Sequence, residues 1–137
     1  MSIARLTTTF AFSLLAVQLA SGVAAAACPN PNPTTHELKF KVKSDGCIEK
    51  VTDKDGNDAP ETKVCEKDTV EWKVTGTGNE KMIAFKSETP LEWAASGFQG
   101  SKVKGEVQPG TKGKKFAYSV YVKNKVCVFD PMIIVEQ

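Results

Sequence analysis

Arginine and histidine are nearly absent from this sequence. Arg5 is the single arginine, so every basic residue after the first few positions is a lysine. Lysine is a flexible point charge and lacks the planar fork with which arginine grips phosphate or carboxylate at two points. Removal of Arg5 from the 18 basic residues leaves 17 Lys against 16 Asp and Glu. This balance argues against a nucleic-acid partner, which would favour a strongly basic surface.

Sequence motifs of common enzymes are also missing. The chain has one histidine, His36, and no nucleophile elbow, no HExxH pair and no glycine-rich phosphate loop. The acids Glu66 and Asp68 stand close together, but they precede an expected strand and are most simply solvated. We therefore expect that the protein is not an enzyme, and we assign no catalytic residue.

The first 27 residues have the organisation of an export signal. Arg5 provides the positive start, residues 10–20 an apolar stretch, and the alanines at 25–27 a cleavage site. The apolar stretch is too short to cross a bilayer. We expect a signal peptide over residues 1–27, no transmembrane segment, and a mature protein that begins near Cys28 in the periplasm or outside the cell. Lipid modification of Cys28 stays open as an alternative.

All four cysteines follow this leader. An even number of cysteines in a small exported domain is typical of a disulfide framework. The sequence therefore predicts two disulfides, and the spacing alone leaves all three pairings open.

Alternation of apolar and polar residues predicts β-strands along the rest of the chain. It is clearest near the C-terminus, where every second residue from Phe116 to Val122 is apolar and residues 132–135 form a continuous apolar run. A hairpin this apolar must be covered by a second sheet. Further strands are expected at 36–43, 47–52, 69–74, 81–85 and 105–107, after an extended arm at 28–35.

A short helix is expected in the long connection at 86–104. Thr89 can cap it, Pro90 fits its first position, and Gly97 can end it. The segment also has an apolar side, formed by Leu91, Trp93 and Phe98. These side chains either cover one end of the β-structure or form an aromatic patch for a protein partner.

Two charged stretches have competing interpretations. The acidic residues at 53–61 resemble a calcium loop, but the sixth position is Asp58 instead of Gly and the twelfth is Val64 instead of Glu, so we expect a solvated turn. Positive charge gathers at the C-terminus, where residues 101–137 contain 7 Lys and 3 acids. These lysines either steer an acidic partner or protect strand edges from pairing with other molecules.

Two stretches have the residue order of a known family. Residues 130–135 read Asp-Pro-Met-Ile-Ile-Val and follow an aromatic-rich strand. Residues 63–85 contain, in order, a Cys, a Thr-Val-x-Trp strand, a polar turn and an apolar strand. In both stretches the chain resembles the cupredoxins, the β-sandwich family of the blue copper proteins. The resemblance covers most of residues 36–136 and implies an all-β Greek-key sandwich over 36–137, with the expected helix in a connecting segment.

The copper ligands of that family are not carried over. Lys81 stands where the family has its first histidine, Val122 stands where it has its cysteine, and the loop that follows has no histidine. Met132 alone could serve as the axial ligand, and the fold implied by the resemblance places His36 at the opposite end. A type 1 site needs two imidazoles and a thiolate, so we expect no metal and no cofactor.

The same resemblance implies a disulfide pairing. The turn after the first strand and the last hairpin loop lie at the copper end of a cupredoxin, which would bring Cys47 to Cys127. The mature N-terminus and the start of the Thr-Val-x-Trp strand lie at the other end, which would bring Cys28 to Cys65. Azurin-type members have a similar bridge before that strand.

Two functional hypotheses follow. The first is an exported binding or interaction module that lacks type 1 copper and works through a protein partner, with its oligomeric state left open. Its candidate interaction surface comprises Leu91, Trp93, Phe98, Lys81, Lys123 and Lys125. The alternative is a periplasmic copper-binding or electron-transfer protein with an atypical ligand set of Cys127, Met132 and Met82, which requires a free thiol at Cys127.

Overall fold

The computed structural model describes residue 28 and residues 31–73 and 80–137. The expected signal peptide at 1–27, part of the expected arm at 29–30 and most of the polar turn at 76–79 lie outside these residues. The described part of the chain is all-β and contains no helix. It therefore also contains no helix that could cross a membrane.

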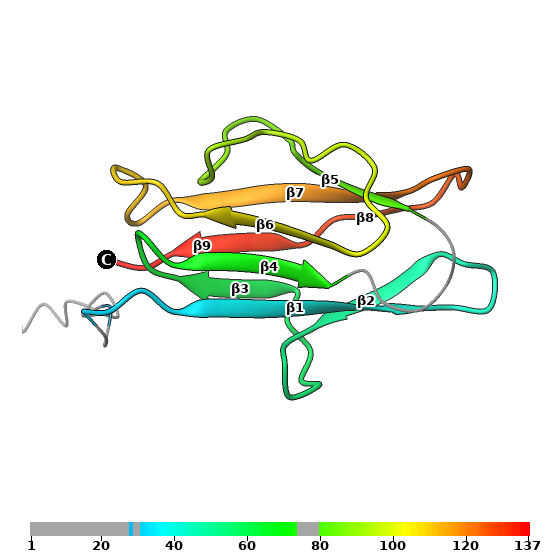
Figure 1. Ribbon diagram of the computed structural model, residues 1–137, viewed down its shortest axis with the longest axis horizontal. Coiled ribbons are helices and arrows are strands. Elements are labelled where there is room, and N and C mark those ends of the chain that lie inside the picture. The colour runs from blue at the N-terminus through cyan, green and yellow to red at the C-terminus, as the bar shows by residue number, and fades with distance from the viewer. Residues whose placement is uncertain (1–27, 29–30, 74–79) are drawn as a thin grey trace, which may run out of the picture.

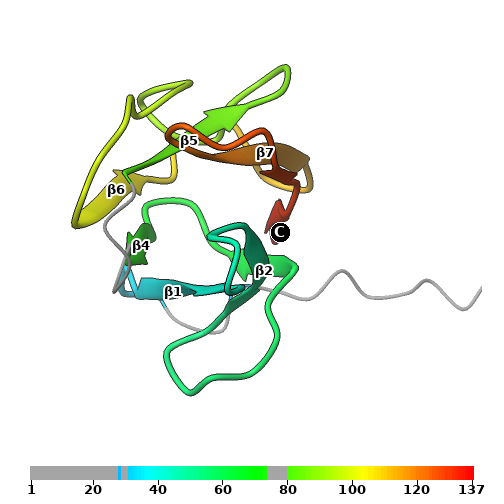
Figure 2. The same cartoon turned by 90° about the vertical axis from the view of Figure 1, so that its right-hand side faces the viewer.

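Nine strands form two packed sheets in the described residues (Figures 1 and 2). They are β1 (Thr35–Val42), β2 (Ile48–Thr52), β3 (Glu61–Val64), β4 (Thr69–Lys73), β5 (Lys81–Phe85), β6 (Lys102–Glu106), β7 (Lys115–Val122), β8 (Val128–Phe129) and β9 (Met132–Val135). One sheet has the order β2-β1-β4-β6 and the other the order β3-β9-β7-β5, with β8 beside β7. Both sheets are mixed, because β1 is parallel to β4 and β3 is parallel to β9. The arrangement is that of a β-sandwich.

Alternating side chains of both sheets meet in one core. Leu38 and Phe40 of β1 and Trp72 of β4 are buried from one side, and Tyr118 of β7 is buried from the other. The Trp72 indole Nε1 donates a hydrogen bond of 3.0 Å to the Tyr118 hydroxyl, and the two rings meet edge to face. Burial raises the pKa of the Tyr118 hydroxyl, and the hydrogen bond with Trp72 acts in the opposite sense. Trp72, the aromatic residue of the Thr-Val-x-Trp strand, therefore lies in the core.

The helix expected at 89–97 is absent, and this prediction is wrong. The Thr89 hydroxyl accepts a hydrogen bond from the Leu91 amide, as in a cap, but it donates to the Trp93 carbonyl and closes a turn. Leu91 then forms an isolated β-bridge with Val107, and its side chain is buried. So short a helix is unstable without packing, and burial of the apolar side chains in an extended backbone wins instead.

The rest of this connection covers the edge of β5. Backbone hydrogen bonds join Lys81 and Gln99 in both directions, and the Ser96 amide donates to the Ile83 carbonyl. The Phe85 amide likewise donates to the Ala94 carbonyl. The connection therefore acts as an irregular extra strand that closes one edge of the sandwich.

Two disulfides lie at opposite ends of the molecule (Figure 1). Cys47 and Cys127 link the β1–β2 turn to the loop after β7, and Cys28 and Cys65 link the N-terminal segment to the start of the β3–β4 connection. This is the pairing that the resemblance implied. All four cysteines are in these two bonds.

Candidate functional site

The atypical copper set is not assembled. The sulfur of Cys127 is bonded to Cys47 and offers no thiolate. Met82 pairs with Tyr121 and Met132 pairs with Ala117, which lie on the same face of β7 four residues apart. At about 3.3 Å per residue, these two positions are separated by about 13 Å along β7. Among the described residues, no group of three or more His, Cys, Asp or Glu side chains is placed to hold a metal ion.

Of the six residues in the candidate interaction surface, some are buried and others are exposed. Lys81 is only 1% exposed and Leu91 only 3%, so neither belongs to a surface, and this part of the prediction is wrong. Desolvation lowers the pKa of the Lys81 ammonium group. Trp93 is half-buried against the core, near Trp72 and Phe85. The side chains that do reach solvent are Phe98, Lys123 and Lys125.

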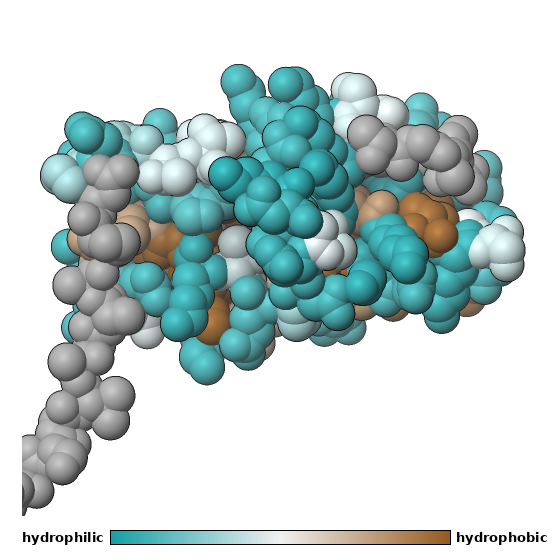
Figure 3. All heavy atoms as spheres, turned by 90° about the horizontal axis from the view of Figure 1, so that it is seen from below, coloured by the Kyte–Doolittle hydropathy of each residue, from teal (hydrophilic) through white to brown (hydrophobic). Residues whose placement is uncertain are grey.

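A groove of about 450 Å³ lies elsewhere, between β1 and β3. Its lining residues come from three segments, 34–38, 53–59 and 61–63. The loop between β2 and β3 projects from this side of the molecule and flanks the groove (Figure 1). Figure 3 views this side and shows mostly hydrophilic side chains, with apolar side chains visible in the hollows between them. A smaller hollow adjoins the groove at His36 and Lys63 and extends to Asp68.

Two incomplete strand edges create this groove. β3 is the edge strand of its sheet. In the other sheet, β2 pairs with β1 only from Lys39 onward, so residues 35–38 of β1 have β4 on one side and, among the residues that the structure describes, no strand on the other. The chain turns away at Thr52 because Asp53 begins a tight turn, in which the Asp53 carboxylate accepts hydrogen bonds from the amides of Asp55 and Asn57.

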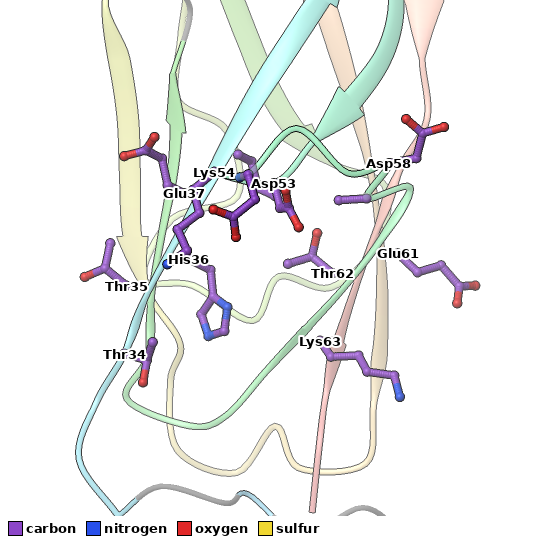
Figure 4. A pocket seen from close by; sticks show the side chains of 13 residues that line it. Thr34, Thr35, His36, Glu37, Asp53, Lys54, Asp58, Glu61, Thr62 and Lys63 are labelled. Carbon is purple, nitrogen blue, oxygen red and sulfur yellow. Dashed lines mark hydrogen bonds between the residues drawn. The ribbon is translucent and has the colours of Figure 1, made fainter.

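Thr62 lies at the bottom of the groove with an unused hydroxyl. Its side chain faces inward from β3 and is 8% exposed. The buried hydroxyl oxygen has no hydrogen-bond partner among the described residues. Figure 4 shows Thr62 between the two strands, while the side chains of Glu61 and Lys63 point away from the space. Buried hydroxyls are rarely left unpaired, because the loss of hydration costs free energy.

His36 and Asp68 form the second polar feature. The His36 Nε2 atom lies 2.7 Å from Asp68 Oδ2. The Asp68 carboxylate also accepts hydrogen bonds from the amides of Thr34 and Cys65. Burial acts to raise the pKa of the Asp68 carboxyl, but these amides and His36 outweigh it and hold the pKa below its usual range. The carboxylate thus fixes the imidazole at the junction of the groove and the adjoining hollow.

The groove retains negative charge after its ion pairs are set aside. Glu37 is paired with Lys73 and Lys39, Asp58 with Lys50, and Lys63 with Glu136. In the described part of the chain, the charged lining residues that remain outside ion pairs are three carboxylates and one lysine. They are Asp53, Asp55, Glu61 and Lys54. The difference, three negative charges against one positive, leaves an excess of two negative charges.

Sequence reasoning missed this site. The signal available was the alternation in Glu61-Thr62-Lys63-Val64, which is the pattern of a short half-buried strand. The acidic stretch that precedes it predicts a long solvated turn and obscures this short pattern. No alternation pattern could show that this strand lies across from the first half of β1.

Comparison with known proteins adds no assignment. A scan against models of protein families found no match, and a search of curated proteins found none.

Proposed function

We propose that this protein is an exported, cupredoxin-like Greek-key β-sandwich that binds another molecule in the β1–β3 groove and has no type 1 copper centre. The observation that carries the proposal is the open groove itself, which lies between the edge strand β3 and the part of β1 that β2 does not pair with. Unpaired strand edges beside a groove present backbone N–H and C=O groups to a bound molecule.

Export is supported by two independent features. The first 27 residues have the order of a signal peptide. Both disulfides lie within the chain, and such bonds persist in oxidising compartments outside the cytoplasm.

The cupredoxin-like assignment is supported by the motifs at 63–85 and 130–135 and by a sandwich of two mixed sheets. The absence of a type 1 centre is supported by the residues at the ligand positions. Lys81 replaces the first histidine, and its side chain is buried. Cys127 is held in a disulfide. Electron transfer through a blue copper site would need ligands that these positions do not provide.

The proposal is tested by photocrosslinking in the organism that carries the gene. A benzophenone amino acid is placed at Thr35 or Glu61, which are exposed and line the groove, and the full chain is exported from its own signal. Glu88 is the matched control, because its side chain is 73% exposed and does not line the groove. We expect adducts from both groove positions and none from Glu88. Adducts from no position, or equally from all three, would overturn the assignment.

A further inference from the structure

We propose that the ligand of the groove is an extended peptide segment that adds as a strand to the free edge of β3 and carries a lysine or arginine. This inference rests on the proposed function and names its ligand class. It combines the direction of the backbone groups, the size of the groove and the carboxylates that are not in ion pairs.

The backbone of β3 forms strand hydrogen bonds along one of its two edges, the edge that faces β9. The carbonyls of Pro60 and Val64 accept hydrogen bonds from Met132 and Glu136 on the β9 side, at 2.9 and 2.8 Å. Backbone groups alternate in direction along a strand, so the N–H and C=O groups of Glu61 and Lys63 point to the opposite edge, which faces the groove. An edge of this kind is the surface that takes up an extended peptide in β-augmentation.

The opposite wall is a second strand edge. The Thr34 carbonyl accepts a hydrogen bond from the Thr69 amide on the β4 side. By the same alternation, the backbone groups of Thr35 and Glu37 turn away from β4. No β2 residue pairs with them, because the β1–β2 ladder begins at Lys39. A guest strand in the groove therefore lies between backbone edges on both sides, which explains why the groove suits a polypeptide.

The dimensions fit a short segment. β3 has four residues, which at about 3.3 Å each give an edge of about 13 Å. The adjoining hollow continues the path past His36 to Glu136. A guest of about five or six residues would occupy this length.

The side chains of such a guest alternate between two environments. Those that point inward lie near the His36 imidazole, so a polar side chain is favoured there. Those that point outward lie beside Glu61, near the carboxylates of Asp53 and Asp55 at the end of the groove. An opposite charge placed beside such residues across a strand pair is favourable. The excess of negative charge therefore selects a basic guest and opposes a second copy of this chain, which would bring the same carboxylates.

The test uses purified, exported full chain and a phage-displayed library of random linear peptides. We expect the selected peptides to contain a lysine or arginine at a fixed position. A synthetic peptide of the selected sequence is then titrated into the wild type and into variants. Lys63→Pro removes the amide on the free edge and leaves the β9 hydrogen bonds in place, and proline is tolerated on edge strands. Lys63→Ala keeps that amide and is the matched control.

Lys63→Pro should weaken binding about tenfold, the size expected when a backbone hydrogen bond and its strand register are lost. Lys63→Ala should bind like the wild type. The double variant Asp55→Asn/Glu61→Gln should bind the basic peptide more weakly at low salt, with a difference that shrinks as salt is added.

The inference would be overturned if the library enriched no peptide on the wild type, if Lys63→Pro and Lys63→Ala bound the peptide equally, or if the selected peptides lacked basic residues. A dimer in sedimentation that Lys63→Pro abolishes would assign the edge to a second copy and also overturn it. Groove crosslinks in cells without peptide binding would leave the proposed function standing and remove the peptide ligand, whereas loss of both would remove both.

Discussion

Replacement of Thr62 by valine should make the protein more stable. The hydroxyl of Thr62 is buried and unpaired in the part of the chain that the structure describes. Valine has nearly the same shape, so no cavity is created, and valine is well suited to a strand. The substitution removes a polar atom that is dehydrated on folding and receives no hydrogen bond in return.

The expected magnitude follows from the cost of an unpaired polar group. Protein mutations place that cost at about 1–3 kcal/mol, so we expect Thr62→Val to raise the free energy of unfolding by about 1 kcal/mol. Thr111 offers a matched control, because it is also a buried threonine, 9% exposed. Its hydroxyl donates a hydrogen bond of 2.6 Å to the Gln108 carbonyl. Thr111→Val should therefore lower the free energy of unfolding by about 1 kcal/mol.

Urea unfolding of the exported, oxidised protein measures both effects. The two variants should differ by about 2 kcal/mol, with unchanged m-values. In thermal unfolding, each 1 kcal/mol corresponds to about 4 °C for a domain near 100 residues. If Thr62→Val destabilises the protein as much as Thr111→Val does, the hydroxyl has a partner in the folded protein and the reasoning is refuted.

Three further predictions concern the framework. Because Cys47 and Cys127 are 80 residues apart, their replacement by serine should lower the free energy of unfolding by up to about 4.5 kcal/mol in urea, and an unchanged midpoint would contradict this. Asp68→Asn should destabilise the protein near neutral pH. The folded pKa of Asp68 is lowered, so its contribution is complete above the unfolded value of about 3.9 and is lost as the pH falls through the folded pKa. Urea unfolding at several pH values should show the gap from the wild type closing in acid, and a constant gap would argue against this linkage. A Cβ at Gly105 would lie 2.8 Å from Leu91 Cδ1, whereas one at Gly100 would meet nothing within 4 Å. Gly105→Ala should therefore cost about 1–3 kcal/mol and Gly100→Ala little, and equal thermal midpoints would count against the packing described.

The strands with the strongest alternation could be predicted from the sequence. β5 has the expected bounds, Lys81–Phe85, and β1, β2, β4, β7 and β9 agree within one or two residues wherever the structure describes them. β6 begins at Lys102, three residues before the expected start. These segments pair a regular period of two with clear turns, so local pattern and tertiary structure agree.

The helix prediction failed because the local signals were outweighed by packing. Thr89 and Pro90 have the residue types of a helix start, and the Thr89 hydroxyl does bond to the Leu91 amide. The side chains of Leu91 and Trp93 pack on the core next to Gly105, where no Cβ stands in the way. Intrinsic helix preference over a few residues is worth less than this burial.

The groove could not be predicted, because it depends on where two sheets end. Thr62 in isolation resembles any threonine on a half-buried strand. Only the absence of a β2 partner for residues 35–38, together with the edge position of β3, leaves a groove beside this strand. The prediction that Lys81 belongs to an interaction surface failed for a related reason. A lysine suggests an exposed position, but the inward face of β5 buries it.

Amide hydrogen exchange, compared between the free edge of β3 and the free edge of β6, tests the central claim most directly. It is measured by NMR on the full exported chain, with and without a peptide selected on it. The account predicts that the peptide slows exchange at Glu61 and Lys63 of β3 by tenfold or more, the protection expected from new backbone hydrogen bonds. Exchange along the β6 edge, Lys102–Glu106, should not change. Unchanged exchange at β3, or equal slowing at both edges, would contradict the assignment of the groove as the binding site.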